Sequence, residues 1–449
     1  MKKKKYSIED QFYNICLLLI VGLNVASTSF MLSCSEWNKK IYFQLAHYAL
    51  VISLFITFTF LAVFIIRNKF YKGYRYGLTY FYLAKNLRRN LLDAEICETS
   101  FLNGVRLPKI FIDLEPDLKT GTIKIANSVH FNKKFENTNI SSALNNYVID
   151  RYYLSNSQNE YVYEIYDKEA MKSFIINSFD EFKEFVSNNG EYQLQLDERS
   201  VAKLQGMLIV GATRSGKTYF IYYLILQLCL KKKKCTLYFA DPKRSSLYVL
   251  GKHLIIENNS CEIDDIITDL KVFYSNMKER ENEMEIQLNT KIDADYRDFN
   301  LKPSIFIIDE YASFIGVVQT LPKEQRDEVN SIIRSIVLMG NQLGYFLIVI
   351  MQKSDATTIP TMIRDNLTFK VVLGNAEDTT YTTSFGTGVE IPLHNFKTGE
   401  GVFTESGIIN TPKLLAIPTL SFDILSAVKE LVNTVTGWCK HPVPSIFYL

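Results

Sequence analysis

Two long apolar runs near the start of the chain dominate its pattern of hydrophobic and polar residues. Residues 11–35 contain no Asp, Glu, Lys or Arg, and residues 47–66 form a second apolar run without them. A helix of about 20 apolar residues spans the hydrocarbon core of a bilayer, and these runs lack the polar stripe of a buried core helix. We therefore expect two transmembrane helices, at about 12–32 and 47–66.

Basic residues are concentrated on the outer flanks of this hairpin. Lys2–Lys5 precede the first run and four basic residues follow the second within residues 67–75, whereas the loop between the runs contains only Lys39 and Lys40. The positive-inside rule predicts a multi-pass protein of the cell membrane with both flanks in the cytoplasm. A cleaved signal peptide is the competing interpretation of the first run, but acidic residues at 9 and 10 interrupt its basic region.

The segment after the second run combines basic and aromatic residues. Residues 67–90 include seven basic residues, no acidic residue and several interleaved Phe and Tyr residues. This pattern indicates an interfacial anchor on anionic lipid, and a neck that contacts nucleic acid is the alternative. We assign residues 1–90 to an N-terminal tip, two transmembrane helices and this basic neck.

Residues 91–192 read as a small α+β adaptor domain. Short β-like runs at 110–114, 120–125 and 161–165 alternate with turn signals, and residues 179–186 have the pattern of a short amphipathic helix. No catalytic constellation stands out in this segment.

From residue 193 to residue 449 the pattern changes to apolar strands alternating with helices. Strands are predicted at 207–210, 236–240, 304–308, 346–350 and 369–373. Such alternation is typical of a parallel sheet with helices on its faces. The predicted fold class is therefore α/β, with this parallel sheet after a transmembrane hairpin and a small α+β domain.

The strand at 207–210 leads directly into a phosphate-binding loop with the pattern GxxxxGK[ST], followed by an apolar helix at 219–230. Glycines let successive N–H groups turn toward phosphates, and the helix N-terminus adds positive potential. We expect ATP at this loop, Lys217 at the β- and γ-phosphates, and Thr218 as a ligand of Mg²⁺. The loop consists of Gly211, Ala212, Thr213, Arg214, Ser215, Gly216, Lys217 and Thr218.

Polar residues follow three further strands. Asp309 and Glu310 come directly after 304–308; Asp309 is expected to hold Mg²⁺ and Glu310 to act as general base on the attacking water. Gln352 follows 346–350 and is expected beside the γ-phosphate. The tetrapeptide 241–244 (DPKR) follows 236–240, at the strand edge where ligands bind in open α/β sheets; a solvated turn is the alternative interpretation.

Composition changes this picture little. The net charge of +2 gives no sign of a bulk nucleic-acid surface, so any such contact depends on local patches. The seven cysteines contain no CxxC pair, which argues against a zinc ribbon or disulfide framework and fits a reducing compartment. Five scattered histidines do not predict a transition-metal site.

Several motifs together resemble the FtsK/SpoIIIE branch of the FtsK–HerA motor superfamily. They are GATRSGKT, DPKR, IIDEYASF at 307–314, QLGYFLIVIMQK at 342–353, IPTMIRDNLTFKVVLG at 359–374 and GEGVF at 399–403. The similarity covers about residues 193–420 and is strongest to FtsK-like coupling proteins of Gram-positive conjugative plasmids and integrative conjugative elements. Arg214 stands where chromosomal translocases usually have Gly.

The resemblance implies a P-loop (RecA-like) parallel-sheet motor domain. Such domains form a ring, expected to be a homo-hexamer, that uses ATP to move DNA with its relaxase to a membrane transfer channel. About 45 residues follow Phe403, too few for the winged-helix module of segregating translocases, which favours transfer over chromosome or plasmid partitioning. A protein-secretion ATPase and a nucleotide-binding membrane scaffold are the alternatives. In ring motors an arginine of the neighbouring subunit completes the site; Arg364 is the first candidate and Arg334 the second.

Overall fold

The computed structural model describes residues 8–35, 40–99, 105–127, 140–168, 174–288, 291, 293–355, 357–387, 389, 391–392 and 394–434. Contacts within the chain group it into two compact units, residues 1–171 and 172–449. The three sequence-based segments, with boundaries after residues 90 and 192, remain a prediction. The predicted basic neck lies in the first unit, and the predicted helix at 179–186 lies in the second.

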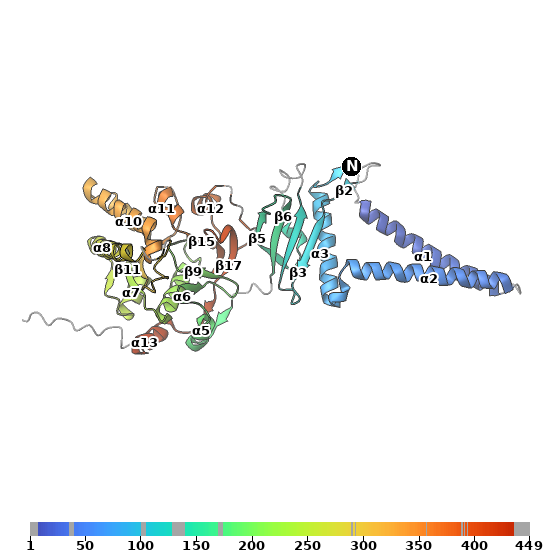
Figure 1. The fold of residues 1–449 in the computed structure, drawn as a ribbon, viewed down its shortest axis with the longest axis horizontal. Helices are drawn as coiled ribbons and strands as arrows, with labels where there is room; N and C mark the ends of the chain where they lie inside the picture. Colours follow the sequence, from blue (N-terminus) through green and yellow to red (C-terminus); the bar gives the residue numbers. More distant parts are fainter. Residues whose placement is uncertain are drawn as a thin grey trace, which may run out of the picture. The chain divides into compact units, whose positions relative to one another are not determined.

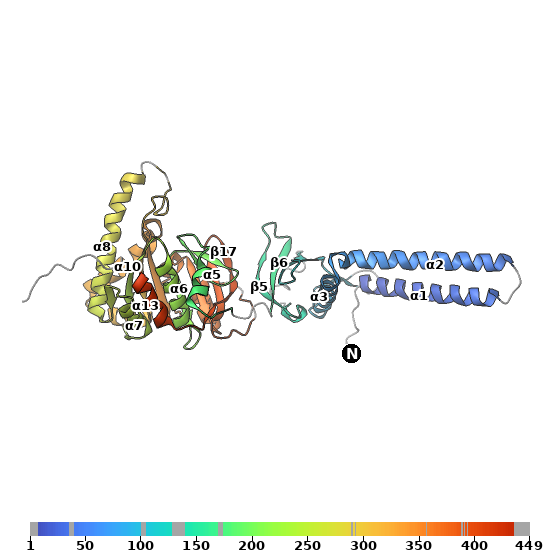
Figure 2. The ribbon, with the colours of Figure 1, turned by 90° about the horizontal axis from the view of Figure 1, so that it is seen from below.

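The first unit begins with a helical hairpin, α1 (Ile8–Ser35) and α2 (Lys40–Arg67), whose helices run side by side in Figures 1 and 2. Asn24 joins them: its Nδ2 donates to Thr57 Oγ1 at 2.7 Å, and its Oδ1 accepts from Ser53 Oγ at 3.1 Å. Most large apolar side chains of both helices are exposed, such as Leu18 and Phe58. The windows 13–33 and 44–67 are long and apolar enough to cross a membrane, which matches the two predicted runs.

The rest of the first unit is a four-stranded antiparallel sheet, in the order β3-β4-β6-β5, covered by helix α3. Leu83, Leu87 and Leu91 lie on one face of α3 at helical spacing and pack on Ile123 and Ile125 of the sheet. The three predicted β-like runs all form strands. The elements are η1 (Phe70–Lys72), α3 (Tyr74–Asp93), β1 (Glu98–Thr99), β2 (Val105–Arg106), β3 (Ile110–Leu114), β4 (Thr120–Ala126), η3 (Ser141–Ala143), β5 (Tyr147–Leu154) and β6 (Glu160–Asp167).

The second unit is built on an eight-stranded sheet in the order β12-β11-β13-β14-β10-β15-β16-β17. The first six strands are parallel, which confirms the predicted parallel sheet, and β16 and β17 extend it in antiparallel fashion. The strands are β10 (Met207–Gly211), β11 (Thr236–Ala240), β12 (Asn258–Ser260), β13 (Ser304–Ile308), β14 (Tyr345–Met351), β15 (Phe369–Leu373), β16 (Glu400–Glu405) and β17 (Ile409–Ala416). Two small pairs stand apart: β7 (Ile175–Ile176) with β18 (Thr419–Leu420), and β8 (Gln193–Gln195) with β9 (Val201–Lys203).

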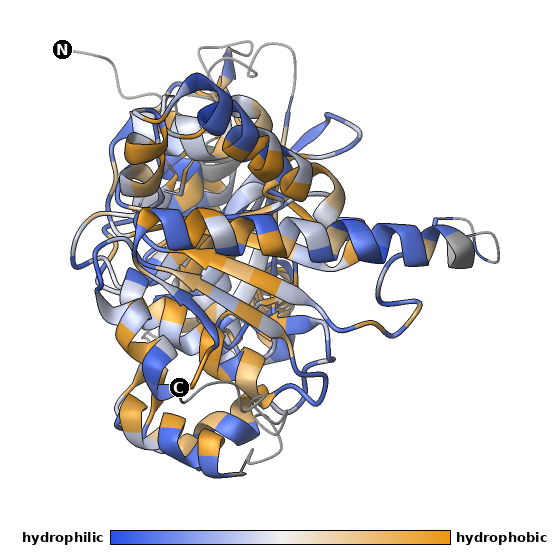
Figure 3. Cartoon of the chain, turned by 90° about the vertical axis from the view of Figure 1, so that its left-hand side faces the viewer, coloured by the Kyte–Doolittle hydropathy of each residue, from blue (hydrophilic) through white to orange (hydrophobic). Residues whose placement is uncertain are grey.

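Helices cover both faces of this sheet because its strands are apolar on both faces. Phe239 and Ile307 point into the core shared with α6, α7 and α13. Their neighbours Tyr238 and Phe306 point the other way, where both rings contact Phe273 of α8. Figure 3 shows the apolar strands in orange beside the long helix α8. The helices are α5 (Phe179–Val186), α6 (Lys217–Leu230), α7 (Ser246–His253), α8 (Ile263–Leu288), α9 (Tyr311–Val318), α10 (Lys323–Leu343), α11 (Thr361–Asn366), α12 (Asp378–Phe385) and α13 (Ile424–Thr434).

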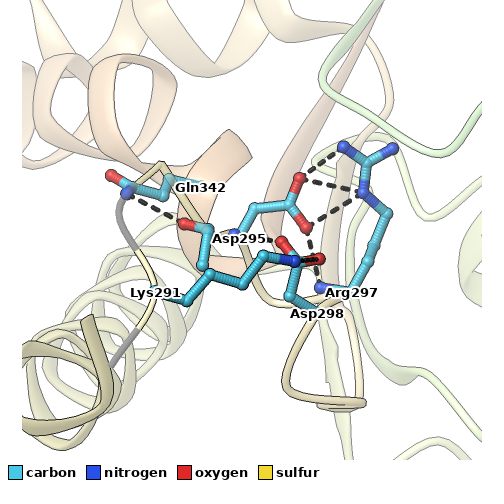
Figure 4. Close-up of polar contacts among 6 residues, drawn as sticks. Lys291, Asp295, Arg297, Asp298 and Gln342 are labelled. Atoms are coloured by element: carbon cyan, nitrogen blue, oxygen red, sulfur yellow. Dashed lines mark hydrogen bonds and ion pairs between the residues drawn. The ribbon is translucent and has the colours of Figure 1, made fainter. Parts of the chain in front are cut away.

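A polar cluster fixes the connection that leads from α8 to β13 (Figure 4). Lys291 pairs with Asp298, and Asp295 pairs with Arg297. Gln342 of α10 donates through Nε2 to the carbonyl of Ala294 at 3.2 Å. These contacts tie the connection to α10, and the connection leads into β13, the strand that Asp309 follows.

Candidate nucleotide site

The site is formed where parallel strands of the second unit end. Gly211 ends β10, and Asp241, Asp309 and Gln352 follow β11, β13 and β14 directly. Because these strands are parallel, their carboxyl ends meet at one edge of the sheet. The register brings them together in neighbouring pairs: Ala240 pairs with Ile308, and Val210 pairs with Met351. The structure therefore gathers the predicted P-loop, acidic pair and glutamine.

The loop between β10 and α6 has the conformation that its glycines permit. Gly216 has φ of +104°, and a Cβ there would lie 2.7 Å from the backbone nitrogen of Gly399. Arg214 also lies in the left-handed region, with φ of 68°. Ala212, Thr213 and Thr218 are exposed, and the side chain of Ser215 is buried beneath the loop. The loop thus presents its backbone and the Thr218 hydroxyl to solvent, as a polyphosphate and a cation ligand require.

Lys217, at the start of α6, is turned onto its own loop. Its ammonium donates to the carbonyl oxygens of Gly211 and Ala212, the latter at 3.0 Å. Burial lowers the pKa of Lys217, and the carboxylates of Glu310 and Asp309 partly offset that effect. An anionic partner would stabilise this half-buried ammonium more than neutral carbonyls do, so the loop fits a bound phosphate group.

A turn from the far end of the domain supports the loop. The backbone N–H of Gly399 donates to the carbonyl of Ser215 at 2.9 Å, and Thr398 Oγ1 donates to the carbonyl of Arg214 at 3.2 Å. Glu400, at the start of β16, holds the turn by accepting from the N–H of Lys397 at 2.9 Å. Through these contacts, the turn before the antiparallel strand β16 helps to hold the P-loop in place.

Asp309 lies in a group of carboxylates and hydroxyls. Ser245 Oγ donates to Asp241 Oδ2 at 2.7 Å and lies 3.4 Å from Asp309 Oδ2. Asp241 is fully buried and also accepts from the backbone N–H of Lys243 and Tyr248. Burial, followed by the charge of Asp241, raises the pKa of Asp309 to about 6. A divalent cation would relieve this crowding of negative charge, so Asp309 fits its predicted role at Mg²⁺.

Glu310 is held from both sides by residues at neighbouring strand ends. Gln352 Nε2 donates to its Oε1 at 2.6 Å, and Lys243 Nζ lies 3.2 Å from its Oε2. The residue itself has φ of 50° and is the N-cap of α9, but its side chain makes no capping hydrogen bond. This arrangement points the predicted general base along the strand-end edge rather than into the core.

The two candidate arginines differ in surroundings. Arg364, on α11, is mostly buried; its Nε donates to Asp365 Oδ1 at 2.7 Å and its Nη1 to the carbonyl of Thr383 at 3.2 Å. Arg334 is exposed on α10. Among the described residues, the contacts of Arg364 are with Asp365 and Thr383 of its own chain rather than with the P-loop. Their roles stay predictions.

The sequence did not reveal that the residues after β11 contact Asp309 and Glu310. Asp241 and Lys243 were recognised at the ligand-binding edge, but Asp241 touches the Asp309 group and Lys243 pairs with Glu310. Ser245 was not singled out. The signal that could have found them is the strand order, because β11 lies next to β13 and places both strand ends side by side.

Comparison with known proteins agrees with the motifs. The FtsK/SpoIIIE family model matches residues 179–355. The FtsK domain-containing protein YdcQ of Bacillus subtilis strain 168 is 31% identical over 240 residues, covering 52% of this chain. The match spans 48% of that protein, about half its length. Residues 179–355 therefore form a domain of the FtsK/SpoIIIE family, and the expectation of an FtsK-type ATPase is confirmed at that level.

Two solved structures align with this chain at low sequence identity. The pCW3 conjugation coupling protein TcpA aligns with a TM-score of 0.49 and 13% identity, covering 78% of this chain and 99% of that chain. ATPases 2 and 3 of EssC from Geobacillus thermodenitrificans align with a TM-score of 0.40 and 16% identity, covering 52% of this chain and 46% of that one. At these scores and identities the likenesses add nothing about activity or partners.

Proposed function

We propose that this chain is a membrane-anchored ATPase that translocates DNA and acts as a coupling protein in conjugative transfer. The observation that carries the proposal is the strand-end group of Lys217, Asp309, Glu310 and Gln352 within an FtsK/SpoIIIE domain. ATP with Mg²⁺ would bind at the loop, where Thr218 and Asp309 would hold the cation. The chemistry is attack of water on the γ-phosphate, assisted by Glu310.

Anchoring is supported by the hairpin of α1 and α2. Both helices expose apolar side chains along their length, and Asn24 satisfies its polar groups within the pair. In a bilayer such exposed apolar surface faces lipid, and polar groups bond between helices. With both flanks in the cytoplasm, the second unit would meet cytoplasmic ATP and DNA.

The conjugative role rests on the motif resemblance to coupling proteins and on this hairpin. The working form would be a homo-hexameric ring in which an arginine of one subunit completes the site of the next. A relaxase bound to the processed strand and the proteins of the transfer channel would be its partners.

The proposal is tested with the full-length chain in detergent, by measuring ATP hydrolysis with and without single- or double-stranded DNA. We expect DNA to raise the rate several-fold, and Lys217→Ala to remove both basal and stimulated rates. Lys323→Ala, which changes an exposed lysine of α10, is the matched control and should behave like the parent. A hydrolysis rate that neither kind of DNA changes, but that rises with a secreted protein, would contradict DNA translocation and favour protein export.

A further inference from the structure

A cavity of about 360 Å³ lies in the first unit where the hairpin meets α3 and the small sheet. Its walls come from the start of α1, the end of α2, one face of α3 and strand β3. The site described above uses none of these elements. The lining residues that matter chemically are Tyr13, Arg67, Tyr80, Phe81, Lys85 and Arg88.

The cavity lies at the end of the hairpin where both apolar windows stop. Tyr13 is the first residue of one window and Arg67 is the last residue of the other. The two helix ends are adjacent, because the ring of Tyr13 lies 4.9 Å from the ring of Phe60. In a membrane-anchored chain this level corresponds to the lipid headgroups.

Three cations line this small volume. They are Arg67, Lys85 and Arg88, and none of the described residues that line the cavity is acidic. Tyr80 lines the same cavity; burial raises the pKa of Tyr80, and the charges of Arg88 and Arg67 partly lower it. Lys85 lies 6.0 Å from the ring centre of Phe81. Cations gathered this closely favour an anionic ligand.

The remaining wall is apolar and aromatic. Phe64 lies 5.9 Å from Phe81 between ring centres, and Ile110 and Ile112 line the same cavity. Cations beside apolar side chains match a ligand with a charged head and an apolar tail. Nucleic acid has the charge but not the tail, and it would have to reach the level of the apolar helices.

We propose that this cavity binds the phosphate group of an anionic phospholipid, with Arg67 and Arg88 as the main contacts and Lys85 as a third. The inference rests on the membrane anchoring in the proposed function, but not on DNA translocation or ATP hydrolysis. Guanidinium groups donate two parallel hydrogen bonds to phosphate, which makes arginine the suitable residue here. The lipid would fix the end of the hairpin against the sheet that follows it.

The test is a titration of the full-length chain, in micelles of neutral detergent, with fluorescent phosphatidylglycerol and separately with fluorescent phosphatidylcholine. The double variant Arg67→Gln/Arg88→Gln should weaken phosphatidylglycerol binding by about 25-fold, from roughly five-fold for each cation. The double variant Arg75→Gln/Arg89→Gln removes two exposed cations of α3 that do not line the cavity, and should change binding less than about two-fold.

Equal losses in both double variants, or equal binding of both lipids, would overturn the proposal in favour of diffuse surface charge. Competition by glycerol 3-phosphate at the same concentration would assign the site to a soluble phosphate ester. A loss of single-stranded DNA binding with lipid binding unchanged would assign it to nucleic acid. ATP hydrolysis in phosphatidylcholine reports folding of each variant; if the double variant fails there, Lys85→Gln alone should still weaken lipid binding. Absence of DNA-stimulated hydrolysis leaves the lipid titration unaffected.

Discussion

The side-chain amide of Gln352 donates a hydrogen bond of 2.6 Å to Oε1 of Glu310. These residues follow neighbouring parallel strands, β14 and β13, so the bond links two strand ends across the site. On its other oxygen Glu310 meets the ammonium of Lys243 at 3.2 Å. A carboxylate held at both oxygens has a fixed direction, which a general base needs before a water can be aligned beside it.

Gln352→Ala should therefore lower the turnover rate more than the apparent affinity for ATP. Without the amide, Glu310 keeps only Lys243 and loses its alignment. We expect kcat to fall roughly 10- to 100-fold and KM for ATP to stay within about three-fold, because the lost contact acts mainly in the transition state. Gln319→Ala, at an exposed glutamine after α9, serves as control. A raised KM with unchanged kcat would instead make Gln352 a nucleotide-binding residue.

Local features of the site were predictable from sequence because they depend on neighbours in the chain. The apolar strand before Gly211, the loop pattern and the helix after it are contiguous, and the structure has β10 and α6 there. Strand β13 covers the predicted range 304–308 and is followed by Asp309 and Glu310. Periodicity and turn chemistry are enough to find such segments.

Contacts that join distant parts of the chain were not predictable in this way. Thr398 bonds to Arg214 across 184 residues, through strands that add to the sheet in antiparallel fashion. Lys231 is buried and donates to the carbonyl of Gly190 at 2.9 Å, across 41 residues of the chain. Both contacts depend on strand order and packing, which local sequence patterns do not reveal.

The backbone conformation of Arg214 leads to a prediction about the stability of two variants. Its φ of 68° is unfavourable for a β-branched residue but open to glycine and asparagine. Arg214→Val should lower the free energy of unfolding by about 1–3 kcal/mol and weaken nucleotide binding. Arg214→Gly should stay within about 1 kcal/mol of the parent, because lost strain offsets the added flexibility of glycine. Thermal unfolding and fluorescent-nucleotide titration measure both, and equal effects of Val and Gly would contradict this explanation.

Arg364 is predicted to act in the site of the neighbouring subunit. Arg364→Ala should lower kcat by about 10³-fold or more, the range for such arginines, and Arg334→Ala should have a much smaller effect. Mixing Arg364→Ala with Lys217→Ala subunits should restore activity, because some interfaces then pair an intact arginine with an intact loop. If Arg364 only supports its own chain through Asp365 and Thr383, the variant will unfold at a lower temperature and mixing will restore nothing.

The titration of Asp309 makes the free energy of unfolding depend on pH. Its pKa of about 6 in the folded chain lies above the ordinary value of 3.8, because burial and Asp241 disfavour its charge. Between these two values the folded chain binds more protons than the unfolded chain, so this group makes stability fall as pH rises from about 4 to about 6. Above pH 6 the full cost of the buried charge is present.

Asp309→Asn removes this charge while keeping the shape of the side chain. In the absence of nucleotide and divalent cations, we expect the variant to be more stable than the parent at pH 8 by about 1–3 kcal/mol. The difference should shrink toward pH 4, where Asp309 is protonated in the folded chain and the unfolded chain begins to bind the same proton. Thermal unfolding in EDTA between pH 4.5 and 8 measures this, with Asp327→Asn as the exposed control. Asp309→Asn should also lose magnesium-dependent ATP hydrolysis, because the neutral amide is a poorer ligand for Mg²⁺ than the carboxylate. A variant that is less stable than the parent at pH 8 would contradict this explanation, because Asp309 would then be charged and favourably paired in the folded chain.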